Sequence, residues 1–126
     1  MAFDSDKFAT YLREHARAHS QAHCARFVRR ALEAAGASTS GYSVNAKSYG
    51  PLLLRNGFRT VKVDNPDKFT PQKGDIVVMD STKQGGQAGH IAGYDGKNWI
   101  SDFIQRDFWP GAAYAKEKPE YVVYRY

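Results

Sequence analysis

The sequence predicts an α+β protein in which N-terminal helices pack on a mostly antiparallel sheet of about five strands. Up to about Gly57, apolar residues recur at helical spacing. From Phe58 onward the spacing changes to the alternation typical of strands, and β-branched and aromatic residues become frequent. Because the helices come first and the strands second, rather than in alternation, we expect an antiparallel sheet and not a doubly wound one.

Three helices are predicted in the first part of the chain. The first covers residues 5–19, behind a polar capping residue. The second covers about residues 24–35 and ends at a glycine stop signal. A third, short helix follows Asn45 and closes at Gly57.

The second part of the chain is predicted to form strands joined by turns. NPDKFTPQKG and RDFWPGAAYAKEKPE carry proline and glycine, so both are expected to be loops. The predicted strands are FRTVKV, DIVVMD, GHIAGY, NWISDFI and YVVYRY.

Length and composition favour one globular domain over residues 1–126. The single cysteine permits no internal disulfide and no multi-thiolate zinc site. No apolar run approaches the ~20 residues of a membrane span, so no membrane insertion is expected. The first residues lack the basic and apolar regions of a signal peptide. We therefore expect synthesis in the cytoplasm and, for action outside it, a dedicated export system.

The net charge of +5 favours an anionic partner, such as nucleic acid, an acidic membrane surface or an anionic cell-wall polymer. The basic residues are scattered, and the densest group is Arg26, Arg29 and Arg30 on the second predicted helix. The simpler interpretation of that group is a solvated helix face. A nucleic-acid-binding module would be expected to show a helix-turn-helix, zinc or RNA-recognition signature, and the sequence shows none.

Cys24, the only cysteine, stands at the predicted start of the second helix. Backbone N–H groups and the helix dipole stabilise a thiolate there, so we expect a lowered thiol pKa. The same amides can hold the oxyanion of a tetrahedral intermediate. A single free cysteine is more often an inert buried residue, and catalysis would require an imidazole to move the proton.

His90 is the candidate partner for Cys24. His23 adjoins the cysteine, but neighbouring side chains on a helix point about 100° apart. His90 instead opens an apolar strand behind the glycine-rich stretch QGGQAG, which lets backbone or ligand approach closely. A lone histidine in a strand is more often structural, but the pairing with a cysteine at a helix start favours catalysis.

A third group is expected to orient the imidazole, and the segment after the His90 strand offers several candidates. A two-residue Asp-Gly loop places Ser101 opposite His90. A three-residue loop or a bulge shifts the register by one position and places Asp102 there. The turn chemistry favours the first register and the need for a carboxylate favours the second. Gln105 is a neutral alternative.

Three segments follow one another in a characteristic order: HCARFVRRAL, PQKGDIVVM and GHIAGYDGKNWISDF. Their order and spacing resemble the papain-like cysteine amidases of the NlpC-type and CHAP group, which cut peptide amides in bacterial peptidoglycan. The likeness covers roughly residues 18–126. In its small size, the chain is most similar to the interbacterial amidase toxins, including those delivered by type VI secretion. Ala25-Arg26 stands where this group typically has Ser-Gly or Thr-Trp, so the bond cleaved stays open.

The resemblance implies a papain-like fold and a catalytic triad that acts through a thioester. Cys24 is then the nucleophile, His90 the general base and acid, and Asp102 the orienting carboxylate. Ser20 and Gln21 are candidates for a second oxyanion donor, although each is more often a helix cap.

Further implications of the resemblance concern substrate and partners. The expected substrate is the peptide stem of peptidoglycan, in the periplasm or cell wall of a target bacterium. No metal or organic cofactor is expected to take part in the reaction. A toxin of this kind implies a cognate immunity protein that blocks the cleft. A phage-type lysin, a cysteine hydrolase of another amide or acyl substrate, and a non-catalytic nucleic-acid-binding module remain alternatives. Candidates for the substrate groove are Trp99, Phe103, Phe108, Trp109, Tyr114, Arg26 and Arg106.

Overall fold

The computed structural model describes residues 3–18, 22–84 and 87–126. Within these segments the helices are α1 (Ser5–His15), α2 (Cys24–Ala34), the 3₁₀ turn η1 (Ala46–Ser48), α3 (Gly50–Arg55) and α4 (Ala112–Glu117). The strands are β1 (Arg59–Val61), β2 (Ile76–Met79), β3 (His90–Tyr94), β4 (Trp99–Ile100) and β5 (Tyr121–Arg125).

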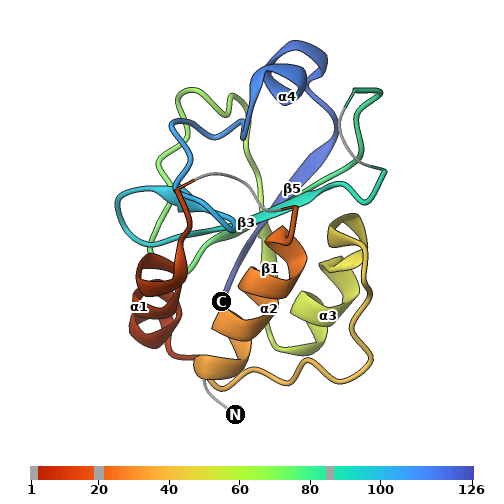
Figure 1. Cartoon of the computed structure of the whole chain (residues 1–126). Helices are drawn as coiled ribbons and strands as arrows, with labels where there is room; N and C mark the ends of the chain where they lie inside the picture. Colours follow the sequence, from red (N-terminus) through yellow and green to blue (C-terminus); the bar gives the residue numbers. More distant parts are fainter. Residues whose placement is uncertain (1–2, 19–21, 85–86) are drawn as a thin grey trace.

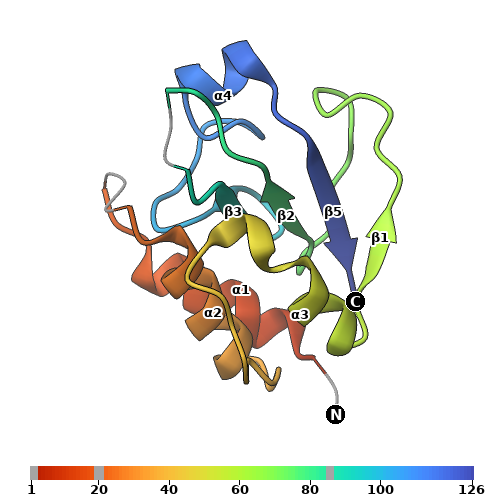
Figure 2. The same ribbon diagram turned by 90° about the vertical axis from the view of Figure 1, so that its right-hand side faces the viewer.

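The strands form one sheet in the order β1-β5-β2-β3-β4, and every neighbouring pair is antiparallel. Helices α1, α2 and α3 lie together against the sheet, whereas α4 stands apart from them (Figures 1 and 2). The predicted α+β class, with N-terminal helices on an antiparallel sheet, is therefore confirmed.

The central strand β2 is buried along its whole length because both faces of the sheet are covered. Ile76 and Val78 belong to the core cluster that includes the residues of α1, α2 and α3. Val77 and Met79 point the other way, into an aromatic-rich cluster with Trp99 and the loop that follows it. Burial on both faces explains why this strand is a continuous apolar run and does not alternate with polar residues.

Helix α1 begins where the sequence predicts, because the Asp4 side chain accepts hydrogen bonds from the Asp6 and Lys7 N–H groups at 3.0 and 3.1 Å. It ends earlier than predicted, at His15. The next residues are extended, and Arg17 forms an isolated bridge with the segment after β4. The tertiary pairing of this segment ends the helix before residue 19.

Two further predictions are wrong in the C-terminal part. The expected strand NWISDFI is reduced to Trp99–Ile100, because the chain reverses directly afterwards. The segment expected to be a loop contains α4, since its AAYAKE run is rich in helix-forming residues once past Pro110 and Gly111. Within the described residues, none of the helices is both long and apolar enough to cross a membrane.

Gly93 lets α1 pack directly on β3, the strand that carries His90. A Cβ atom at this position would lie 2.5 Å from Phe8 Cζ and 2.8 Å from Leu12 Cδ1. Both side chains are fully buried in the helix-facing core, so neither can move away without displacing the helix. The spacing between α1 and the sheet therefore requires glycine here.

We expect Gly93→Ala to lower the free energy of unfolding by about 1–3 kcal/mol, because the added methyl group overpacks the core. Urea denaturation followed by circular dichroism measures the change. Gly111→Ala is the matched control, since a Cβ there meets no atom within 4 Å and the backbone is extended. Equal stability of the Gly93→Ala and Gly111→Ala proteins would contradict this packing.

Candidate active site

Cys24 is the first residue of α2 and lies half-buried against the start of β3. The backbone N–H of Ile91, the residue that follows His90, acts to lower the pKa of the thiol. The amides of Cys24 and Ala25 at the helix N-terminus act in the same direction. The packing of α2 on β3 thus brings the thiol to the backbone that carries the imidazole.

His90 is the first residue of β3, pairs with Met79 of β2 and is only 7% exposed. The preceding Gly89 has a left-handed backbone, with φ of 77°. A Cβ atom on Gly89 would collide with the Met79 carbonyl oxygen and with Lys47 Cβ. This glycine is what lets the chain enter β3 with His90 at the strand start.

The amide side chain of Gln105 holds the imidazole. Gln105 Oε1 lies 2.8 Å from His90 Nε2. The Gln105 NH₂ group donates to the carbonyl oxygens of Asp107 and Phe108 at 3.1 and 3.3 Å, so the amide cannot turn over without losing both bonds. Its oxygen must therefore accept from His90 Nε2–H. In the neutral imidazole this leaves the Nδ1 lone pair free to take a proton.

Asp102 supports the turn that precedes Cys24. Its side chain accepts a hydrogen bond from the backbone N–H of His23 at 2.9 Å, and its carbonyl oxygen accepts from the Arg17 N–H at 2.8 Å. The carboxylate is buried, and its charge acts on both Cys24 and His90. The residue predicted to orient the imidazole thus anchors the turn ahead of Cys24, and Gln105 contacts the ring.

The hairpin between β3 and β4 explains this difference. Tyr94 pairs with Trp99, so the four residues 95–98 form the loop, and both predicted registers are wrong. The Asp95 side chain accepts from two backbone N–H groups of the loop at 2.9 and 2.6 Å, which stabilises this longer connection.

The chain then doubles back after Ile100, which brings Gln105 next to His90. Ile100 and Ile104 form an antiparallel bridge, and the Gln105 N–H donates to the Trp99 carbonyl oxygen at 2.9 Å. Sequence reasoning named Gln105 only as the neutral alternative, because this reversal depends on tertiary contacts.

Burial dominates the protonation of both candidate catalytic groups. Burial and the Asp102 charge raise the pKa of the Cys24 thiol, although the backbone amides of Ile91, Ala25 and Cys24 act in the opposite direction. The predicted net lowering of the thiol pKa is therefore wrong, because the helix start is not exposed. Burial also lowers the pKa of His90, against the opposing effects of Gln105 and Asp102. The resting pair consists of a thiol and a neutral imidazole.

Cys24 opens onto a pocket of about 200 Å³ between the start of α2 and residues 42–49. Arg26, a predicted groove residue, lines this pocket. Tyr114 of α4, another predicted groove residue, lies with its ring centroid 5.6 Å from that of His90. Each of these two residues therefore lies beside one of the predicted catalytic residues, Arg26 beside Cys24 and Tyr114 beside His90.

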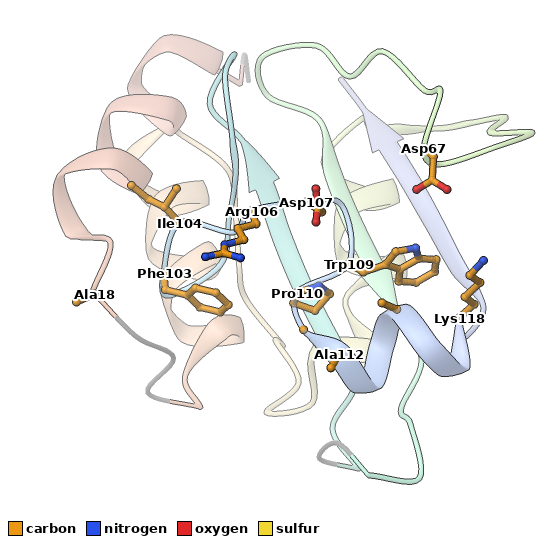
Figure 3. Close-up of a pocket in the computed structure, with 12 residues that line it drawn as sticks. Ala18, Asp67, Phe103, Ile104, Arg106, Asp107, Trp109, Pro110, Ala112 and Lys118 are labelled. Carbon is orange, nitrogen blue, oxygen red and sulfur yellow. The ribbon is translucent and has the colours of Figure 1, made fainter.

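Phe103, Arg106 and Trp109 line a different and larger pocket of about 910 Å³ beside α4. In Figure 3, Phe103 and Arg106 lie next to each other on one side of it, and Trp109 lies on the other side, toward Asp67 and Lys118. Among the described residues, none lines both this pocket and the Cys24 pocket. These three groove candidates are therefore not brought together with the thiol.

The remaining candidates divide into core residues and undescribed ones. Trp99 and Phe108 are each 6% exposed and pack edge to face in the aromatic cluster on the far side of the sheet. Both are core residues in this structure. The oxyanion candidates Ser20 and Gln21 lie outside the described residues.

Comparison with known proteins adds a family to this geometry. The model of the bacteriophage peptidoglycan hydrolase family matches residues 7–115. The chain belongs to this family. A comparison with curated proteins gives no match. Membership makes the chain a relative of peptidoglycan hydrolases and confirms the resemblance to enzymes of this class noted in the sequence.

Solved structures similar to this chain are of a type VI effector–immunity complex. One is a chain in the native effector–immunity complex Tae3–Tai3 from Ralstonia pickettii, with 38% identity and a TM-score of 0.87, covering 98% of this chain and 99% of that one. The second is a chain in the selenomethionine form of the same complex, with 39% identity and a TM-score of 0.83, covering 94% and 98%. The similarity to type VI effectors is likewise confirmed.

The Gln105 contact predicts one tautomer of His90. We expect ¹⁵N NMR at neutral pH to show the proton on Nε2 and none on Nδ1, because the amide oxygen faces Nε2. In Gln105→Leu this preference should be lost, and kcat/KM on peptidoglycan should fall by about 10²-fold as the ring loses its orientation. A proton on Nδ1 in the wild-type protein would contradict the assignment.

Proposed function

We propose that this chain is a cysteine amidase that cleaves amide bonds in the peptide stems of bacterial peptidoglycan. The observation that carries the proposal is the juxtaposition at the start of β3. There α2 packs on β3 with Cys24 as its first residue, the Ile91 N–H acts on the thiol, and His90, the residue before Ile91, is held by Gln105 with Nδ1 free. Membership in a family of peptidoglycan hydrolases supplies the substrate class.

The first half of the reaction forms a thioester. The Cys24 sulfur attacks the amide carbonyl carbon while its proton passes to His90 Nδ1. The tetrahedral intermediate collapses, the C–N bond breaks, and the Nδ1 proton goes to the leaving amine. Water then attacks the thioester with His90 as base, which releases the carboxylate and restores the thiol.

The burial of the pair fits this sequence of proton transfers. A neutral imidazole beside a protonated thiol is ready to accept the proton as the sulfur attacks. The imidazolium that forms is stabilised by the buried Asp102, whose charge raises the pKa of His90. Asp102 thus contributes to catalysis through its charge and through the turn it anchors, and Gln105 supplies the orientation.

The oxyanion is held at the N-terminus of α2. The Cys24 N–H is one donor, in accordance with the orientation of helix N-terminal amides toward developing negative charge. A second donor comes from the residues just ahead of the helix, for which Ser20 and Gln21 are the candidates.

The biological role that fits this amidase is an interbacterial toxin. The similar solved structures carry the name of a type VI effector–immunity complex and match nearly the whole of both chains. On this basis the chain is delivered to the cell wall of a target bacterium, and a cognate immunity protein binds over the Cys24 pocket in the producing cell.

Cys24→Ala and His90→Ala should both abolish muropeptide release from purified sacculi, because each variant removes one half of the proton-transferring pair. Mass spectrometry of the products should show new amine and carboxylate ends for the wild-type protein only. His15→Ala is the matched control, since His15 is an exposed histidine on α1. Release at the wild-type rate by a folded Cys24→Ala protein would overturn the proposal.

A further inference from the structure

The lining of the Cys24 pocket, as far as the structure describes it, includes two arginines and no acidic residue. The arginines, Arg26 and Arg29, both come from α2. Arg26 is exposed, whereas Arg29 is partly buried. The other walls are formed by small and aromatic side chains and include Tyr42, Ser43, Val44, Ala46 and Tyr49.

Arg29 is held in place by a ring and has no acidic partner. Its guanidinium carbon lies 3.8 Å from the centroid of the Tyr42 ring, which fixes the plane of the group. Among the described residues, the ion pairs within 4.0 Å do not include Arg29, and its buried Nε–H has no hydrogen-bond acceptor. The stacking orders the cation, and none of the ion pairs of the described residues engages it.

A purely structural role does not account for this arrangement. A partly buried charge without a counterion lowers stability, and native proteins normally pair such groups. The same chain pairs its other partly buried arginine fully, since Arg125 donates two hydrogen bonds of 2.8 Å to Asp75. The unpaired cation beside the nucleophile is therefore suited to an anion that arrives with the substrate.

We infer that Arg29 binds a carboxylate of the stem peptide and makes a free acid group next to the scissile amide a condition of tight binding. This inference rests on the proposed function. Arg29 and Cys24 line the same pocket, so an anion held by the guanidinium lies in the pocket onto which the thiol opens. Guanidinium groups recognise carboxylates through paired N–H donors, and they do not bind a carboxamide in this way.

The test is a binding measurement on the Cys24→Ala protein, which does not depend on turnover. The probes are a synthetic stem tetrapeptide of L-alanine, γ-D-glutamate, diaminopimelate and D-alanine, and the same peptide with its carboxylates converted to carboxamides. Isothermal titration calorimetry should give a Kd about 10- to 100-fold lower for the acid than for the amidated peptide.

Arg29→Gln in the same background should weaken binding of the acid peptide to the level of the amidated one and leave the amidated peptide unchanged. Arg29→Lys keeps the charge but not the planar stack, and it should retain part of the preference. Arg30→Gln removes the same charge from an exposed position outside the pocket and is the matched control. A substitution that merely unfolded the protein would weaken binding of both peptides.

Equal affinity of the two peptides, or an unchanged preference in Arg29→Gln, would overturn the inference even if the wild-type enzyme cleaves the acid peptide. Conversely, a selective, Arg29-dependent affinity in a protein whose wild-type form cleaves no stem peptide would overturn only the proposed amidase function. The two failures are thus distinguishable.

Discussion

The hydrogen bond between His90 and Gln105 is the contact on which the candidate site depends. It connects the first residue of β3 to a segment that has left the sheet and turned back. Two backbone carbonyl oxygens fix the Gln105 amide, and the amide in turn fixes which imidazole nitrogen is free. Through the Gln105 amide, the backbone thus determines that His90 Nε2 carries the proton. The group that contacts Nε2 is the oxygen of an amide and not of a carboxylate.

The surroundings of this pair favour neutral groups at rest. Burial opposes charge on both the thiol and the imidazole, and Asp102 favours the protonated form of each. In the proposed reaction the proton stays on sulfur until a carbonyl group is present, and the buried carboxylate then stabilises the imidazolium. A helix N-terminus lowers the pKa of a cysteine only when desolvation does not outweigh its amides.

Sequence reasoning named Cys24 and His90, the two groups on which the proposed reaction depends, but not the contacts around them. The positions of Cys24 at a helix start and of His90 at a strand start follow from the spacing of apolar residues and from the glycines at the ends of elements. Both are local signals. The choice between Asp102 and Gln105 depends on how Asp95 extends the hairpin loop and on a reversal after β4, so it is set by tertiary contacts. The direction of the Cys24 pKa shift was missed for the same reason, because burial cannot be obtained from sequence spacing.

The central claim is that Cys24 carries the acyl group during turnover. The most direct measurement is an acid quench of the enzyme reacting with stem peptide, followed by protease digestion and mass spectrometry of the fragment that contains Cys24. We predict a mass increase on Cys24 equal to the acyl part of the cleaved peptide, and its release by hydroxylamine, as a thioester requires. Product formation with the acyl group on another residue, or with no enzyme-bound acyl group at all, would contradict the account.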